Sequence, residues 1–331
     1  MIDLVARPVR MRIGDANVKM LGYDGSIPGP TLHVTQGSQA TVVFRNETEL
    51  PTTVHWHGLR HDNHFDGVPQ GHHRGMQPPV GPHETYTYDL RFPDPGIFWY
   101  HPHIREDYGQ EQGLYGAILV EPIEPAYWAP VDHEIPLVLD DILIEDDDVT
   151  SFDTTESDHT LMGRFGNVML ANGDANFTTT VRVGEVARLY LINAANTRTF
   201  DFAIPGARMK LVGADNGRVE KEALVDGVVL APSERAIVDV LFERAGLLAM
   251  EHRTPNRVYP VGRVVVQEGW RSRPSQRARE FWTLRHSPEL AQARTELASE
   301  PARPPAMSIT FTGLMDGMTV HHGKVSLARE P

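Results

Sequence analysis

The chain has 331 residues, of which 40% are hydrophobic, and carries a formal net charge of −13 at pH 7. This length allows two domains and part of a third, and the acidic balance disfavours nucleic acid or an acidic membrane surface as a partner. The absence of cysteine excludes disulfides, thiol catalysis and thiolate metal ligands in this sequence, and without an apolar run of about 18 residues no transmembrane helix is expected.

Residues 1–122 are predicted to form β-strands. The first residues, MIDLVARPVRMRIGD, lack the apolar segment of a signal peptide, so none is expected, and composition leaves the compartment open. Apolar and polar residues then alternate, with Gly, Asp, Asn or Pro roughly every 8–12 residues. This pattern is typical of a β-sandwich or barrel.

Two histidine pairs lie within this region. His55 and His57 belong to TVHWHGLRHDNHFDGVPQ, and His101 and His103 belong to PGIFWYHPHIREDYG. Because alternate side chains of a strand point to one face, each pair aims two imidazoles at one spot. Imidazole suits Cu, Zn, Fe and Ni, so two such strands side by side predict a site for one or two metal ions. One pair alone is more often two half-exposed strand histidines than a metal site, and the repetition of the pair favours metal binding.

Other residues near the two pairs are given lesser roles. Asp66 and Asp107 are candidates for orienting the imidazole rings, although a structural role is the preferred interpretation for each. The neighbouring aromatic side chains are expected to exclude water and hold the rings in place: Trp56, Phe98, Trp99 and Tyr100. The remaining histidines of the region lack the H-x-H spacing and are expected to be solvated, or at most to rim a site: His61, His64, His72, His73 and His83.

The second half is predicted to repeat the sandwich without the chemistry. A Pro-rich connection, EPIEPAYWAPVDHEIP, precedes a strand, LVLDDILI, and an acidic stretch, EDDDVTSFDTTESDH, that is expected to be an exposed loop. Residues 165–268 alternate again, and TTTVRVGEVARLYLINAAN shares with TLHVTQGSQATVVFRNET the order strand, Gly turn, strand, Asn. No H-x-H occurs in this half.

From about residue 271 the sequence is charged and Pro-bounded. It predicts a linker with a short helix near 289–299, followed by one strand at SITFTG. We therefore expect a first domain at 1–125 with both histidine pairs, a second domain at 130–270, and a linker with the start of a further domain at 271–331.

These motifs closely resemble the amino-terminal and middle domains of multicopper oxidases, the laccase-like group. The resemblance rests on TVHWHGLR, DGVPQ, PGIFWYHPH and GLYGAILVEP in the first half, and on RLYLINAANTRTFDFAIPG and LAPSERAIVDVLFE in the second. It implies an all-β fold of two cupredoxin-like Greek-key β-sandwich domains, with a C-terminal linker and a stray strand. The family's third domain is missing from the pattern.

The resemblance also implies roles for the four histidines. His55 corresponds to a type 2 copper ligand, and His57, His101 and His103 correspond to type 3 ligands. They would form half of a trinuclear copper cluster that reduces dioxygen to water with electrons from phenols, aromatic amines or metal ions. The type 1 copper of the family needs a cysteine thiolate, so no type 1 site is expected in this chain.

Two functions of different classes therefore stay open. The chain is an oxidoreductase of multicopper-oxidase type or a truncated part of one, completed by a C-terminal domain in trans or by self-association. Alternatively, it is a non-catalytic copper-binding or interaction module of the cupredoxin type. A cupin-type metalloenzyme fits less well, because that pattern needs a Glu shortly after the first H-x-H and residues 58–64 contain none. Members of the family are often secreted or periplasmic, and the sequence itself does not fix the location.

Overall fold

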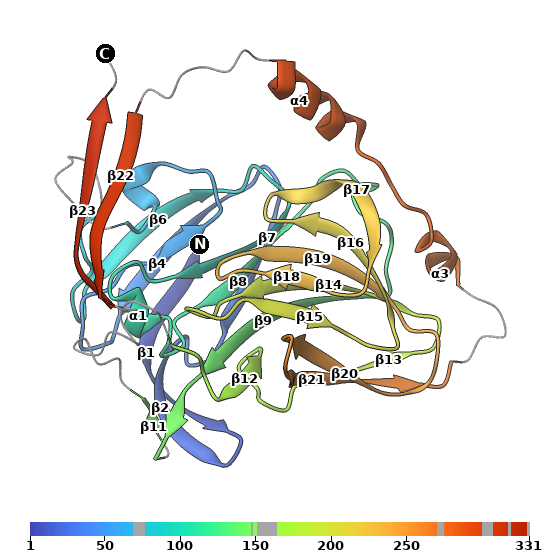
Figure 1. The fold of residues 1–331 in the computed structure, drawn as a ribbon, viewed down its shortest axis with the longest axis horizontal. Helices are drawn as coiled ribbons and strands as arrows, with labels where there is room; N and C mark the ends of the chain where they lie inside the picture. The colour runs from blue at the N-terminus through green and yellow to red at the C-terminus, as the bar shows by residue number, and fades with distance from the viewer. Residues whose placement is uncertain are drawn as a thin grey trace. The chain divides into compact units, whose positions relative to one another are not determined.

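A computed structural model describes residues 1–68, 77–146, 148–150, 164–269, 275–299, 307–316 and 319–329. The chain divides into two compact units, the first made of residues 1–151 and 165–286 and the second of residues 152–164 and 287–331. Figure 1 shows that the first unit is built almost entirely of strands. Within the described ranges, no helix combines the length and the apolar character needed to cross a membrane.

The first β-sandwich consists of two four-stranded sheets. One sheet has the order β2 (Ala16–Tyr23), β1 (Ile2–Ile13), β4 (Gln39–Asn46) and β6 (Thr85–Arg91). The other has the order β3 (Gly29–Thr35), β8 (Gly116–Glu121), β7 (Gly96–His101) and β5 (His55–His57). Two short helices, η1 (Asn63–Phe65) and α1 (Glu106–Gly109), follow the two histidine-bearing strands.

The second β-sandwich has a six-stranded and a five-stranded sheet. The larger has the order β12 (Val168–Ala171), β9 (His133–Ile142), β14 (Val186–Asn193), β19 (Arg235–Leu241), β16 (Arg208–Ala214) and β17 (Gly217–Val225). The smaller has the order β13 (Thr178–Arg182), β21 (Val258–Gln267), β20 (Gly246–Arg253), β15 (Phe200–Ala203) and β18 (Val228–Leu230). A small hairpin joins β10 (Ile144–Glu145) to β11 (Asp148–Val149).

The two sandwiches repeat one scheme, as the sequence predicts. In the first, β1 pairs in parallel with β4 and β3 with β8; in the second, β9 pairs in parallel with β14 and β13 with β21. Asn46 and Asn193, which end β4 and β14, are fully buried. Each side chain donates to two backbone carbonyls and accepts from the amide two residues further on. The shared Asn therefore satisfies the buried backbone at the same turn of both copies.

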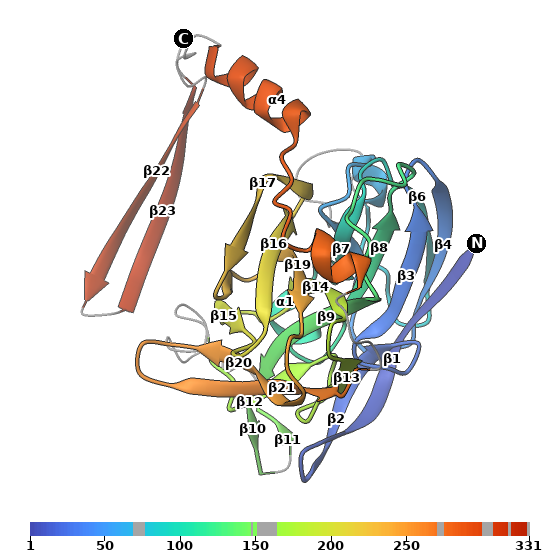
Figure 2. The same cartoon turned by 90° about the vertical axis from the view of Figure 1, so that its right-hand side faces the viewer.

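Strand β7 is buried on both faces, which fixes the end that carries His101. Phe98 and Tyr100 point into the core of the first sandwich, whereas Ile97 and Trp99 belong to a second apolar cluster that includes Tyr190 of β14. The period of two therefore separates a face inside the first sandwich from a face against the second. Figure 2 shows β7 and β8 beside β9 and β14, between the two sandwiches. A strand held on both sides gives its terminal histidine a defined position.

The end of the first unit differs from the linker that the sequence predicts. Residues 276–280 form a short helix, α3 (Gln276–Glu280), and Ala278 and Phe281 pack against Val186 and Leu241 of the second sandwich. Apolar side chains in the stretch REFW explain this docking, because their burial offsets the cost of ordering the segment.

The second unit contains a helix and a hairpin. The helix α4 (Pro288–Ser299) agrees with the one predicted near 289–299. SITFTG lies in β22 (Met307–Asp316), but it is paired with β23 (Thr319–Arg329), so two strands replace the single one expected. Pairing satisfies backbone groups that a lone strand leaves open. The acidic loop is predicted at residues 145–159; its residues 147 and 151–159 lie outside the described residues, and its start takes part in the β10–β11 pair.

Candidate metal centre

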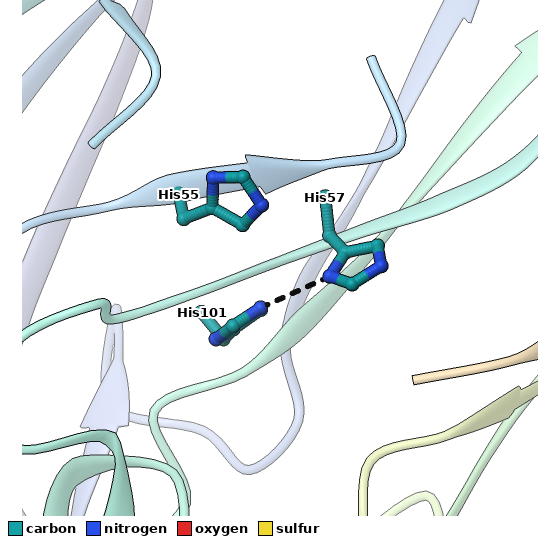
Figure 3. Close-up of side chains that lie close together, drawn as sticks. All are labelled: His55, His57 and His101. Carbon is teal, nitrogen blue, oxygen red and sulfur yellow. Dashed lines mark hydrogen bonds between the residues drawn. The ribbon is translucent and has the colours of Figure 1, made fainter. Parts of the chain in front are cut away.

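Two neighbouring strands bring three of the predicted histidines together. β5 pairs antiparallel with β7, with His55 opposite His101 and His57 opposite Trp99. Since Trp56 points into the core, His55 and His57 emerge on the other face. Their ring centroids lie 5.4 Å apart, and those of His55 and His101 lie 5.3 Å apart. Figure 3 shows the three rings converging from the two strands.

The ring nitrogens have the spacing of metal ligands. One nitrogen from each of His55, His57 and His101 lies within 4.8 Å of the others. Among the described residues, these three form the group of side chains close enough together to hold a metal ion. His57 Nδ1 is 3.3 Å from His101 Nε2 (Figure 3). Two nitrogens bonded to one ion at about 2.0–2.1 Å with tetrahedral geometry lie roughly 3.3–3.4 Å apart. The donor set therefore fits a metal ion shared by His57 and His101.

Backbone carbonyls set which nitrogen two of the rings present. His101 Nδ1 lies 2.8 Å from the carbonyl oxygen of Pro102, and His55 Nδ1 lies 2.7 Å from that of Asp66. A carbonyl only accepts, so in each neutral ring Nδ1 carries the hydrogen and Nε2 keeps its lone pair. Such partners orient histidine ligands in metal sites generally. His55 and His101 are thus held with Nε2 free to bind metal.

His103 is placed beside this group. Its ring centroid lies 5.3 Å from that of His55 and 6.4 Å from that of His101. Its backbone N–H donates to Thr53 Oγ1 at 3.2 Å, which fixes the chain just after β7. Its ring nitrogens are not part of the group of mutually close ligand atoms, which is limited to His55, His57 and His101.

The predicted solvation of His61 is wrong. Its side chain is only 3% exposed, and Nε2 donates to Asp66 Oδ1 at 3.0 Å. Asp66 in turn contacts His55, so it touches a candidate metal ligand and is more than the structural residue preferred from sequence. The loop after β5 folds back onto the start of that strand, where Gly67 meets the backbone of Val54. This return brings both side chains to the site.

The other loop residues stay away from the site where they are described. The side chain of His64 is 63% exposed and bonds to Asp62, and His83 is exposed. Asp107, the second candidate for orienting a ring, instead pairs with Arg105 at 3.0 Å. His72 and His73 lie outside the described residues.

Burial keeps two of the imidazoles neutral. Burial, and after it the nearby Arg235 guanidinium, lower the pKa of His57 to about 3. Burial also holds the pKa of His101 well below its usual range. Hydrogen bonds from His55 and then from His61 hold the pKa of Asp66 well below its usual range. The site is thus ready for a metal, because only unprotonated imidazole binds one.

Aromatic packing shields the same rings, as predicted from sequence. Trp99 stacks on His101 with centroids 4.1 Å apart and an interplanar angle of 22°. It also lies 5.1 Å from His57. Trp99 is 1% exposed, so it removes water from one side of both imidazoles and lowers the local dielectric response.

Arg235 of the second sandwich supports the turn after His57, a role that sequence reasoning missed. Its side chain is 5% exposed, pairs with Asp215 at 2.9 Å, and has Cζ 6.0 Å from the ring centre of Phe98. A Cβ on Gly58 would lie 2.6 Å from the Arg235 guanidinium, so glycine permits this approach. The only signal in the sequence is a charged residue opening the apolar run AIVDVLF.

Known proteins match both sandwiches. A multicopper oxidase family matches residues 6–125, and a second multicopper oxidase family matches residues 133–245. The chain is 29% identical over 272 residues to multicopper oxidase MmcO of Mycobacterium tuberculosis, covering 73% of this chain and 51% of that protein. It is 27% identical to copper resistance protein A of Escherichia coli, covering 71% of this chain and 46% of that protein. The chain therefore spans about half the length of the curated relatives it matches.

Solved structures resemble the same region. A multi-copper oxidase from Pseudomonas thermotolerans has a TM-score of 0.74 and 30% identity, covering 83% of this chain and 64% of that one. Lac15 from a marine microbial metagenome has a TM-score of 0.69 and 32% identity, covering 83% of this chain and 69% of that one. The all-β arrangement of two cupredoxin-like sandwiches is shared with these structures.

Proposed function

Because the chain belongs to the multicopper oxidase family, whose members use copper cofactors, we propose that its histidine pairs hold copper. His55 serves as a type 2 ligand, and His57, His101 and His103 serve as type 3 ligands, forming half of a trinuclear cluster. The observation that carries the proposal is the 3.3 Å separation of His57 Nδ1 and His101 Nε2, the spacing expected of two ligands on one ion. The role of His103 rests on its place in the motif.

We propose that the chain takes part in one-electron oxidation of a substrate coupled to reduction of dioxygen. Copper, when bound, accepts and passes on single electrons, which imidazole ligands withstand unchanged. The protein's own part is to present bare nitrogens from His55 and His101, to keep His57 unprotonated, and to exclude water with Trp99. A phenol, an aromatic amine or a low-valent metal ion is the class of reductant we propose.

The rest of the electron path needs residues beyond this sequence. A type 1 copper requires a cysteine thiolate, and these 331 residues include none. We propose that a further cupredoxin domain, in cis, in trans or through self-association, supplies the thiolate and the other half of the cluster.

Copper content tests the proposal. We expect one or two copper ions per chain after expression in copper-replete medium, and loss of them in His55→Ala/His101→Ala, because two of three converging ligands are removed. Elemental analysis of purified protein gives the stoichiometry, and His64→Ala, in the same loop but 63% exposed, is the matched control. Copper-free wild type, or equal copper in the double variant, would contradict the proposal.

Oxygen consumption then separates the two functions that the sequence leaves open. A chain that consumes dioxygen with a phenolic reductant once a cysteine-bearing domain is added is the oxidoreductase. A chain that keeps its copper but consumes no oxygen, even with such a domain present, would favour the non-catalytic copper-binding module. The three converging histidines are enough for that second function, because it needs only metal binding.

A further inference from the structure

His61 is a buried side chain in an exposed stretch of loop. The neighbouring side chains of Arg60 and Asp62 are 73% and 65% exposed, whereas that of His61 is 3% exposed. Burying a polar ring costs free energy unless its hydrogen bonds are replaced. We therefore expect the buried ring of His61 to be compensated by a specific hydrogen bond, which its exposed neighbours do not need.

The hydrogen bonds of His61 show which of its ring nitrogens carries the hydrogen. Nε2 is 3.0 Å from Asp66 Oδ1, and a carboxylate only accepts, so Nε2 carries the hydrogen. Nδ1 is buried and has no hydrogen-bond partner among the described residues. The opposite tautomer would bury an unpaired N–H and face a lone pair toward the carboxylate. His61 is thus fixed as a donor to Asp66.

Asp66 joins His61 to a candidate metal ligand. His55 Nδ1 lies 2.7 Å from the backbone oxygen of Asp66 and 3.3 Å from Oδ1, the same carboxylate oxygen that His61 holds. The backbone N–H of Asp66 donates to the carbonyl of Asn63, which closes the turn of η1 between His61 and Asp66. One aspartate therefore receives hydrogen bonds from both rings.

The Asp66 side chain is 30% exposed, so water can reach its carboxylate, whereas the side chain of His61 is buried. With Arg60 and Asp62 it lines a polar hollow of about 850 Å³, and Asp66 is not among the lining residues. The hydrogen bond from His61 occupies Oδ1, the carboxylate oxygen that lies 3.3 Å from His55 Nδ1, and so limits competition from water at that oxygen.

We propose that His61 is a positioning residue for the metal centre. It holds the Asp66 carboxylate and the returning loop against His55, so that His55 presents a bare Nε2 before any metal arrives. The inference rests on the proposed function in one respect, the role of His55 as a metal ligand. It concerns a residue with no direct contact to the metal site.

Three variants test this role: His61→Leu, which fills the space without a donor, His61→Gln, whose amide Nε2 keeps one, and His64→Leu as a loop control. Competition titrations with Cu(II) and with Zn(II) measure affinity, and ¹⁵N NMR of the histidine rings in metal-free protein reports the tautomer of His55, assigned with His55→Ala. Loss of outer partners of ligating histidines typically weakens binding about 10–100-fold, and we expect about 10-fold for His61→Leu. We expect His55 to lose its Nδ1–H preference in this variant, and both properties to be near wild type in the other two.

The outcomes separate this inference from the proposed function. A folded His61→Leu protein, by circular dichroism, with wild-type affinity and the wild-type tautomer of His55 would overturn the positioning role. So would equal losses of affinity in His61→Leu and His61→Gln with the tautomer unchanged, which would mean a packing role only. If wild type binds neither metal, the proposed function fails, and the tautomer in metal-free protein still decides whether His61 positions His55.

Discussion

Acidification from pH 7 to pH 5 is expected to lower the free energy of unfolding of the metal-free chain by up to about 2 kcal/mol for each of His57 and His101. Burial lowers the pKa of His57 to about 3 and that of His101 well below its usual range. An unfolded histidine titrates near 6.5, so below this pH the unfolded chain binds protons that the native chain does not. Stability is therefore fully present above about pH 6.5 and decreases as the pH falls toward the native pKa values.

A variant isolates this contribution, because other groups titrate as well. Burial raises the pKa of Asp140, which destabilises the native chain as the pH rises above the unfolded value and so opposes the histidines. In His57→Gln/His101→Gln the Asp140 contribution stays and the histidine contribution is removed. Urea unfolding with a chelator at pH 7, 6 and 5 should show a fall that is smaller than in wild type by up to about 4 kcal/mol. Parallel pH profiles of the two proteins would mean that the imidazoles are not held neutral.

Strand periodicity explains how much of the site could be predicted from sequence. His55 and His57 flank Trp56, and His101 follows Trp99 at the same alternation, so one rule places the three imidazoles on the face opposite the core. The same rule, with the repeated Gly turn and Asn, predicts two copies of one sandwich. Such local patterns predict side-chain orientation well because successive side chains of a strand can point to only two faces.

Contacts made by a returning loop have no such pattern. His61 is buried only because residues 58–67 fold back onto β5, and nothing in HGLRHDNHFDG distinguishes it from the exposed His64. The bond from His55 to Asp66 uses a backbone carbonyl, which every residue has. Arg235 bonds to the carbonyl of Ile97 across 138 residues of chain, a distance in sequence that no local spacing encodes. The converging histidines could therefore be predicted from the sequence, whereas the groups that orient their rings could not.

Replacing Gly67 with alanine is expected to lower the free energy of unfolding by about 3 kcal/mol or more and to weaken metal binding. Gly67 has φ of +73°, and a Cβ would lie 2.0 Å from the carbonyl oxygen of Val54 and 2.6 Å from the backbone nitrogen of His55. Backbone atoms cannot swing aside as a side chain can, so the loop must lift from β5. Asp66, the preceding residue, would then leave His55, and loss of such a partner typically weakens metal affinity about 10–100-fold.

Gly37→Ala separates the two costs of this substitution. Gly37 has φ of +79°, close to that of Gly67, but a Cβ there would meet nothing within 4 Å. It should lose only the cost of the left-handed conformation, about 1–2 kcal/mol, and keep its metal affinity. Urea unfolding and Zn(II) titration of both variants give the comparison. If Gly67→Ala loses no more stability than Gly37→Ala and binds zinc like wild type, the return of the loop onto β5 is not what holds His55 in place. If only Gly67→Ala loses zinc affinity, metal binding depends on the close contact between the backbone of Gly67 and that of Val54 and His55, where no side chain fits.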